Sequence, residues 1–364
     1  MPYTYTYGSG TEGDPYQVWT ANDLDGVRDH LDKYFIQMAD INLGVSPWNE
    51  NEGWVPIGDG NSDNIEDMFR GEYDQNNFTI SGLTINRPSE WHQGLFGRMW
   101  KSKYINFNVI NASVNGLGNV SIICGRLTGI YVTATKTYAH FENGYVEGIS
   151  KGARTVGDII GITFDIDLNE GVKIYNCHTD VNIIIDKTYY TEVYSIGGII
   201  GSGEHTNIQE CSSKGTISME DSLDAEYVYY IGGIAGYLGG SASNTENSYS
   251  RKNFENIYAT GAGYIDSIGG CFGYFLTNNN TTKNCYSTGS IPLSGATIGG
   301  FMGNYVSGTI TNCYYDSETS GQSDTGKGTP KTTAEMIYPY SDPDNVYIDW
   351  DFHTVWAHDK GGSA

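Results

Sequence analysis

A short apolar segment bracketed by glycines recurs along most of the chain, and this repeat limits the possible folds more than any other feature. The copies are QGLFG at 93–97, SIICG at 121–125, GDIIG at 157–161, GGIIG at 197–201, GGIAG at 232–236, GGCFG at 269–273 and GGFMG at 299–303. Most copies are followed by a second element, seen as YNCHTD at 175–180, QECSSKGTI at 209–217, ENSYS at 246–250, KNCYSTGSI at 283–291 and TNCYYDS at 311–317. Each repeat is therefore predicted to hold two or three short strands separated by turns.

The repeats differ in length, because successive closing glycines lie between 28 residues apart (97 to 125) and 40 residues apart (161 to 201). One such repeat cannot bury its apolar side alone, whereas stacked repeats share a continuous core. A propeller blade needs four strands and about 40 residues, which the shorter repeats do not provide. The sequence therefore predicts an all-β fold, a single-stranded parallel β-helix. Its coils would have a constant shape, and loops of different length would project from their corners.

The two ends of the chain differ from the repeats, as expected of a solenoid that must cover its terminal coils. We expect three parts: an N-terminal cap with the first coils at 1–92, the repeats at 93–320, and a C-terminal cap at 321–364. Thr20 and Asp23 form a capping-box-like start, which predicts a helix over about 21–33. A second short helix is predicted at 332–336, beside an aromatic segment at 350–356 that would close the last coil.

The charge of the chain excludes two classes of partner. Its 364 residues include 43 acidic and 20 basic side chains, which gives a formal net charge of −23. A field of this sign repels phosphate backbones and anionic headgroups, so neither nucleic acid nor a membrane surface is an expected partner. No apolar run approaches the roughly 18 residues of a membrane helix, so no membrane insertion is expected. The opening MPYTYTYGSG has neither a basic nor an apolar leader region, so no signal peptide is expected in this chain.

The repeat also carries a family resemblance. The GGIxG segment followed by NCYSTGSI resembles the GLUG motif, which is found in large bacterial surface proteins and in some phage proteins. The opening GTEGDPYQVWTANDLDGVR and the tail TTAEM followed by WDFHTVWA are similar to the usual ends of such arrays, so the resemblance runs from about Gly8 to Trp356. It implies a right-handed β-helix and a role in adhesion, surface display or substrate binding. The copies at 121–125 and 157–161 depart from the motif because they lack the paired glycines.

Four of the six cysteines occupy one position of the repeat, and another repeat has a serine there. The five residues are Cys177, Cys211, Ser248, Cys285 and Cys313. Alternation of Cys and Ser at one position predicts a ladder of small inward side chains, that is, buried free thiols rather than disulfides or metal ligands.

One loop has the oxygen-rich spacing of a calcium site. Positions 1, 3, 5 and 9 of a calcium-binding loop are matched by Asp59, Asn61, Asp63 and Asp67. The sixth position is Asn64 where glycine is usual, and the twelfth is Arg70 where a bidentate Glu is needed, so an acidic solvent loop is the alternative. Calcium is the one candidate cofactor, and no sequence motif nominates catalytic residues.

Tyrosines and carboxylates gather in the loops that lead into successive glycine-bracketed segments. The candidate ligand-binding residues are Tyr189, Tyr190 and Glu192 in one loop, Asp224, Tyr227 and Tyr229 in the next, and Tyr258 and Tyr264 in a third. Stacking would bring these loops to one side of the solenoid, with coils ~4.8 Å apart. Tyrosine rings stack on sugar C–H faces while carboxylates accept hydrogen bonds from hydroxyls, which predicts a glycan surface; ordinary cross-strand packing is the alternative. The net charge of −23 favours a ligand that is neutral, cationic or bridged by calcium.

These features predict a non-enzymatic adhesion, receptor-binding or structural surface protein that binds a cell-surface glycan or protein. A phage virion tail or fibre component fits the lack of a leader, and its YTYTY segment at 3–7 would add a strand to another virion or surface subunit. A secreted adhesin of a bacterium or archaeon is the first alternative. The second is a polysaccharide-degrading hydrolase or lyase, for which Asp165, Asp167 and Glu170 offer neighbouring carboxylates.

Overall fold

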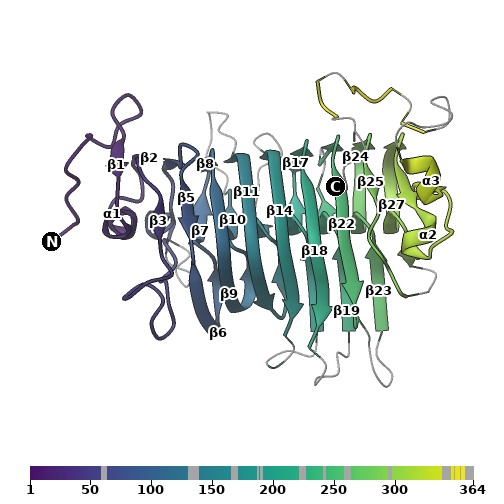
Figure 1. The fold of residues 1–364 in the computed structure, drawn as a ribbon, viewed down its shortest axis with the longest axis horizontal. Coiled ribbons are helices and arrows are strands. Elements are labelled where there is room, and N and C mark those ends of the chain that lie inside the picture. Colours follow the sequence, from purple (N-terminus) through teal and green to yellow (C-terminus); the bar gives the residue numbers. More distant parts are fainter. Residues whose placement is uncertain are drawn as a thin grey trace.

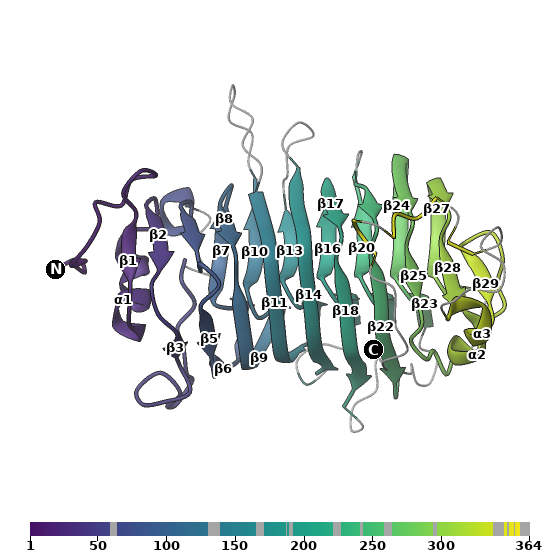
Figure 2. The ribbon, with the colours of Figure 1, turned by 45° about the horizontal axis from the view of Figure 1, so that its top comes forward.

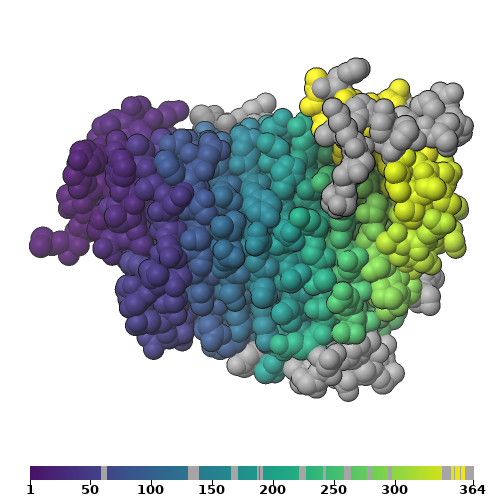
Figure 3. All heavy atoms as spheres, in the orientation of Figure 1, coloured from purple at the N-terminus to yellow at the C-terminus, as the bar shows by residue number. Residues whose placement is uncertain are grey.

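The chain winds into a parallel β-solenoid, which confirms the predicted all-β β-helix. The structure, a computed structural model, describes residues 1–58, 64–129, 139–164, 171–186, 188, 192–220, 227–240, 243–257, 264–293, 297–337, 346–347, 349–352 and 354–356, without the side chains of 277–279. The strands lie across one long axis and follow one another in chain order along it (Figure 1), and the same stacking is seen from a second direction in Figure 2. In the space-filling view the coils form successive bands of colour (Figure 3).

Each coil passes through four stacks of parallel strands, here called stacks A to D in chain order. Stack A consists of β12 (Thr155–Val156), β15 (Glu192–Gly197), β19 (Tyr227–Gly232), β23 (Tyr264–Gly269) and β26 (Ile298–Gly299), preceded by the last residues of β6 (Thr84–Gln93) and β9 (Asn108–Val120). Stack B consists of β7 (Phe96–Trp100), β10 (Cys124–Thr128), β13 (Ile160–Phe164), β16 (Ile200–Glu204), β20 (Ala235–Gly239) and the first residues of β24 (Phe272–Lys283) and β27 (Met302–Thr311).

The other two stacks complete the coil. Stack C consists of β1 (Tyr16–Val18), β2 (Tyr34–Gln37), β4 (Glu72–Asp74), β8 (Lys103–Ile105), the first residues of β11 (Ala139–Gly152) and β14 (Val172–Ile185), β17 (Thr206–Gln209), β21 (Thr245–Glu246) and the last residues of β24 and β27. Stack D consists of β3 (Ile41–Asn42), β5 (Thr79–Ser81), the remainder of β9, β11 and β14, then β18 (Ser212–Met219), β22 (Tyr249–Glu255), β25 (Tyr286–Ser287), β28 (Tyr314–Asp316) and β29 (Thr329–Lys331).

The core consists of ladders in which one inward position is repeated from coil to coil. One ladder in stack C is built from Phe35, Tyr73, Tyr104, Phe141, Ile174 and Ile208, all of them buried. The buried hydroxyls are satisfied, because Tyr73 donates to Gln37 at 3.2 Å and Tyr104 donates to Gln75. Burying one such side chain contributes about 1.5–3 kcal/mol, so the shared core supplies what no single repeat could.

The cysteine ladder has the predicted form. All six thiols are free and buried. At the corner between stacks C and D, the side chain points inward and donates to the carbonyl two residues earlier, as Cys211 Sγ does to Gln209 at 3.1 Å and Ser248 Oγ does to Glu246 at 2.9 Å. A small donor suffices at this position, which explains why Cys and Ser alternate there.

The departure of GDIIG from the paired glycines has a structural reason. Asp158 stands where the next coil has Gly198, and its carboxylate is fully buried with Oδ2 3.0 Å from Nζ of Lys252. Lys252 comes from β22, two coils further on, and passes Gly198, at which a Cβ would lie 2.8 Å from Lys252 Cε. Thr179 Oγ1 donates to the same carboxylate oxygen at 2.6 Å, and Lys252 also donates to the carbonyl of Val181 at 2.5 Å. Burial raises the pKa of Asp158 to about 6 and lowers the pKa of Lys252. The 3.0 Å contact between the two side chains connects their coils from inside the core.

The N-terminal helix begins where predicted and is shorter than predicted. α1 (Ala21–Gly26) starts at the capping box of Thr20 and Asp23 and is followed by a 3-10 turn, η1 (Val27–Asp29). The prediction of a helix over 21–33 is therefore correct for its first turns and wrong for residues 30–33, which are not helical. Gly26 is a poor helix former, and β2 begins at Tyr34, so the residues between them turn the chain into the next coil.

Two side chains of the YTYTY segment pack on its own chain, and the strand that this segment was expected to add to another subunit stays a prediction. The Tyr3 hydroxyl donates to Asp23 Oδ1 at 2.5 Å, and the ring of Tyr5 stacks on that of Tyr16 with centroids 4.5 Å apart. Only 8% of Tyr5 is exposed. These alternate rings find an apolar surface on the cap itself, so the segment covers the first coil.

The C-terminal end contains the predicted short helix. α2 (Ser317–Ser320) follows β28, and α3 (Thr333–Met336) has a capping box formed by Thr332 and Glu335. The aromatic segment does not close the last coil as expected. It runs back beside stack D, where Trp356 lies 4.4 Å from Trp350 and 6.1 Å from Tyr249, ring centroid to centroid. Tyr249, Tyr286 and Tyr314 form a ladder in successive coils, and the rings of Trp350 and Trp356 pack on this ladder.

Candidate ligand-binding groove

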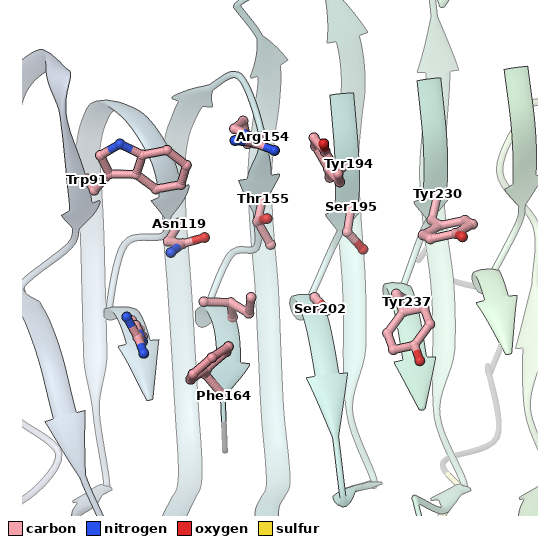
Figure 4. Close-up of a pocket in the computed structure, with 12 residues that line it drawn as sticks. Trp91, Asn119, Arg154, Thr155, Phe164, Tyr194, Ser195, Ser202, Tyr230 and Tyr237 are labelled. Atoms are coloured by element: carbon pink, nitrogen blue, oxygen red, sulfur yellow. The ribbon is translucent and has the colours of Figure 1, made fainter. Parts of the chain in front are cut away.

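A groove runs over the outer side of the solenoid where stack A passes into stack B (Figure 4). It encloses about 460 Å³, and its lining is formed by Trp91, Asn119, Arg126, Arg154, Thr155, Ile162, Phe164, Tyr194, Ser195, Ser202, Tyr230 and Tyr237. This volume lies within the roughly 300–1,000 Å³ of small-molecule sites. The lining residues come from consecutive coils between β6 and β20, so the groove follows the long axis of the solenoid.

One wall of the groove holds Arg154 and Tyr194, in a row that continues past the lining residues to Tyr229. Arg154, Tyr194 and Tyr229 belong to this row, because the residues that follow them in stack A are register partners. The Arg154 guanidinium lies 4.1 Å from the centroid of the Tyr194 ring and 5.6 Å from that of Trp91. Tyr194 stacks on Tyr229 with centroids 5.1 Å apart. The in-register coils thus convert single side chains into a continuous stacked wall.

The opposite wall comes from stack B. Its row consists of Arg126, Ile162, Ser202 and Tyr237, which are register partners in consecutive coils, and Tyr274 continues the row one coil past the groove. The Arg126 guanidinium lies 4.4 Å from the centroid of the Phe164 ring, and 44% of Phe164 is exposed. Both walls therefore combine an arginine near the N-terminal end with tyrosines further along.

Small polar side chains lie between the two walls. Figure 4 shows Asn119, Thr155 and Ser195 in this position. The Ser195 hydroxyl donates to the carbonyl of Gly201 at 2.7 Å, which fixes its rotamer. At Gly118 a Cβ would lie 2.7 Å from the Trp91 ring, so the missing side chain leaves room for the indole at this end of the groove.

The tyrosine hydroxyls of the groove stay protonated at neutral pH. Burial raises the pKa of Tyr230 to about 12, and burial together with Glu204 raises the pKa of Tyr237. The pKa of Tyr194 is raised chiefly by the hydrogen bond that its hydroxyl donates to Glu192 at 2.7 Å, against the opposing effect of Arg154. Among the described lining residues two are arginines and none is a carboxylate, while the Glu192 carboxylate lies at the edge through its bond with Tyr194. The groove therefore offers rings and hydroxyls, with two arginines in its walls.

The sequence-predicted ligand residues converge where the structure describes them. Glu192, Tyr227 and Tyr264 are register partners in consecutive coils of stack A. Tyr227 is 41% exposed and Tyr264 is 52% exposed. Tyr229 stacks on a wall residue of the groove. The remaining candidates, Tyr189, Tyr190, Asp224 and Tyr258, lie outside the described residues, as do the possible catalytic carboxylates Asp165, Asp167 and Glu170.

Sequence reasoning missed the arginine end of the groove. It did not single out Trp91, Arg126, Arg154, Phe164 or Tyr237. A signal was present, because Arg154 stands three residues before Gly157 just as Tyr194 stands three residues before Gly197. Aligning the repeats on their glycines would have placed this arginine in the tyrosine row.

The calcium site stays a prediction. Asp59, Asn61 and Asp63 lie outside the described residues, and Asp67 ends the short 3-10 helix η2 (Ile65–Asp67). Asp67 also lines a second hollow of about 490 Å³ beside the N-terminal cap. In the part of the chain that the structure describes, no three His, Cys, Asp or Glu residues are grouped to hold a metal ion.

Comparison with known sequences finds two curated relatives and no matching family model. A protein of Evansella cellulosilytica, provisionally named a Gly-rich membrane protein, is 29% identical over 403 residues, which cover 96% of this chain and 44% of that protein. Halomucin of Haloquadratum walsbyi is 33% identical over 165 residues, which cover 43% of this chain and 2% of that protein. The chain thus spans less than half the length of each relative. Within the described residues, no helix is both apolar and long enough to cross a membrane.

Two solved structures share the fold. One, from Bacteroides ovatus, is provisionally described as an immunoglobulin A1 protease; it superposes with a TM-score of 0.59 at 19% identity and covers 85% of this chain and 87% of that one. Another, described as IgA1 Protease, superposes with a TM-score of 0.52 at 14% identity and covers 82% of this chain and 21% of that one. At these identities the likeness shows a common β-helix architecture and no more.

Proposed function

We propose that this β-helix is a non-enzymatic binding protein of a cell surface and that its groove holds a carbohydrate. The observation that carries the proposal is the pair of ring-bearing walls along the groove, with hydroxyl and amide side chains between them. Sugars present apolar C–H faces that stack on rings and hydroxyls that exchange hydrogen bonds with such side chains. Apolar walls with a few placed polar groups are the usual composition of a ligand site.

The relatives favour the cell-surface setting over a virion. The Evansella cellulosilytica relative is named a membrane protein, and this chain matches 44% of its length. A β-helix of this kind would therefore act as one segment of a larger surface protein, whose GLUG-type repeats extend the binding face away from the cell. A protein receptor in place of a glycan, and a virion tail or fibre in place of a cell surface, remain the alternatives.

Loss of the groove rings tests the proposal. The variants Tyr194→Ala and Tyr237→Ala each remove one ring from a wall, and we expect each to weaken binding to an immobilised panel of neutral and acidic polysaccharides by roughly 10-fold. Tyr7→Ala is the matched control, because Tyr7 is 56% exposed and lies in the N-terminal segment, away from the groove. Binding is measured by calorimetry with the polysaccharides that the panel selects. If no polysaccharide binds, or if both groove variants bind as well as the control, the proposal fails.

The same polysaccharides separate a binding protein from an enzyme. A hydrolase needs two carboxylates about 5–10 Å apart, and none of the described lining residues is a carboxylate. We therefore expect the protein to leave the size distribution of a bound polysaccharide unchanged after prolonged incubation. Shortened chains, detected by size-exclusion chromatography, would favour the degrading enzyme instead.

A further inference from the structure

We propose that Asp158 and Lys252 condense into an intramolecular amide, an isopeptide bond that joins two coils of the solenoid covalently. The two side chains are in contact, with Asp158 Oδ2 3.0 Å from Lys252 Nζ, and neither side chain is exposed to solvent. Asp158 lies in the turn between β12 and β13, whereas Lys252 lies in β22, two coils further on. The inference concerns the interior of the solenoid and is independent of any ligand in the groove.

Burial removes what normally opposes this condensation. In water a carboxylate and an ammonium group do not condense, because hydration stabilises both ions, and in the core this hydration is lost. Burial raises the pKa of Asp158 to about 6 and lowers the pKa of Lys252. The neutral acid and the neutral amine therefore lie closer in energy to the ion pair than they do in water. The neutral amine is the nucleophile, so its formation is the condition for attack on the carboxyl carbon.

The hydrogen bonds around the pair fit the product of the condensation. Asp158 Oδ2 accepts a hydrogen bond from Thr179 Oγ1 at 2.6 Å, and Lys252 Nζ donates to the carbonyl of Val181. Asp158 Oδ1 is buried and has no hydrogen-bond partner among the described residues. A buried acceptor without a partner is costly, and the condensation removes it, because Oδ1 is the oxygen that leaves. In the amide, Oδ2 would keep the hydrogen bond from Thr179, and the remaining N–H would keep the one to Val181.

The reaction balances without an oxidant, a reductant or any other co-reactant. The lone pair of Lys252 Nζ forms a bond to Asp158 Cγ, and the bond between Cγ and Oδ1 breaks. Two protons of the ammonium group move to Oδ1, which leaves as water, and the third proton remains as the amide N–H. Groups that a fold holds in contact in a reactive geometry reach effective concentrations of about 10⁵–10⁸ M, so the folded chain can carry out this step by itself.

The bond would limit how the solenoid opens. Each coil of a solenoid contacts only its neighbours, so such a fold can open coil by coil from one end. A covalent bond between coils that are not adjacent would stop this opening between Asp158 and Lys252. The neighbouring ion pair of Lys214 and Asp180 offers a comparison, because its contact of 2.8 Å is as short but its side chains are 55% and 37% exposed. Hydration keeps both of these ions stable, so we expect them to remain an ion pair.

The mass of the intact, denatured full chain tests the inference. We expect the wild-type protein to be lighter than its calculated mass by one water, whereas Lys252→Met, which lacks the amine, should have its calculated mass. Digestion of the wild type with trypsin should also yield a branched peptide in which the segment with Asp158 is joined to the segment with Lys252. This peptide distinguishes the isopeptide bond from a succinimide at another aspartate, which also loses one water.

Two further variants complete the experiment. Lys214→Met is the matched control, because it breaks the exposed ion pair with Asp180 and should keep the loss of one water. The double variant Asp158→Asn with Lys252→Met leaves no unpaired charge in the core, so it can fold where Lys252→Met alone does not, and it should have its calculated mass. Thermal melting shows which variants are folded. A wild-type chain with its calculated mass, both when fresh and after prolonged incubation in the folded state, overturns the inference. A loss of water that Lys252→Met retains, or a digest without the branched peptide, overturns it as well.

Discussion

At the scale of single residues, the corner between stacks C and D depends on a left-handed backbone. The residue before each Cys or Ser of the inward ladder has a positive φ, with 49° at Asn176, 52° at Asn247 and 52° at Asn284. Asparagine tolerates this conformation better than other non-glycine residues. Its side chain also bonds along the stack, as Asn284 Nδ2 does to Asn247 Oδ1 at 3.2 Å. The exception is Glu210, which has the same conformation at φ 55° without the asparagine side chain.

This exception yields a prediction about stability. Glu210→Asn should raise the free energy of unfolding by roughly 1 kcal/mol, since left-handed backbone disfavours Glu by an amount of that order. The measurement is urea denaturation followed by circular dichroism. Glu142→Asn makes the same exchange in extended backbone of β11 and should be neutral or slightly destabilising. Equal effects at both positions would show that charge removal, rather than backbone conformation, controls the result.

At the scale of the repeated element, the paired glycines are needed for close packing between coils. Neither Gly232 nor Gly233 has a positive φ, unlike the turn glycines. A Cβ at Gly233 would lie 2.2 Å from the carbonyl oxygen of Gly270 in the next coil and 1.9 Å from the Ser250 hydroxyl. Between these two coils the second glycine of the motif therefore permits the close approach, and there is no room for a methyl group at Gly233.

The corresponding prediction concerns the motif itself. Gly233→Ala should lower the free energy of unfolding by about 3 kcal/mol or more. The new methyl group would overlap the backbone carbonyl of Gly270 and the buried Ser250 side chain. Gly13→Ala is the control, since nothing lies within 4 Å of a Cβ built there. Thermal melting of the two variants side by side provides the measurement. A Gly233→Ala protein that melts with the wild type would mean that the coils separate more easily than this packing implies.

The coils were predictable from the sequence because each repeats the same local pattern. The glycine-bracketed segments and the Cys or Ser ladder recur at one position per repeat, so their placement follows from stacking alone. The groove was harder to predict, because its walls are rows that run through several coils. Arg126 and Tyr237, for example, belong to one row only because the strands between them are in register. The path of the tail was also hidden, since nothing near Trp356 in the sequence indicates that Tyr249 lies beside it.

At the scale of the whole molecule, the charge acts differently at long and at short range. A polyanion that approaches from solution meets the field of a chain with a net charge of −23. Within the groove it meets the side chains of the walls, among them Arg126 and Arg154. The long-range field is screened by salt over about 10 Å at 0.1 M ionic strength, whereas hydrogen-bonded contacts in a partly buried site are screened much less.

The long-range field and the short-range contacts predict how salt changes the binding of an acidic polysaccharide such as alginate. As salt rises from a low concentration, the association rate should increase, because screening removes the repulsion between two negatively charged partners. The dissociation rate should rise only modestly, since it reflects the short-range contacts inside the groove. Stopped-flow measurements with a fluorescently labelled acidic polymer give both rates, and its carboxyl-reduced form, which carries no charge, should associate at a rate that salt hardly changes. An association rate that falls as salt increases would instead mean that the arginines, rather than the net charge of the chain, govern the approach of the ligand.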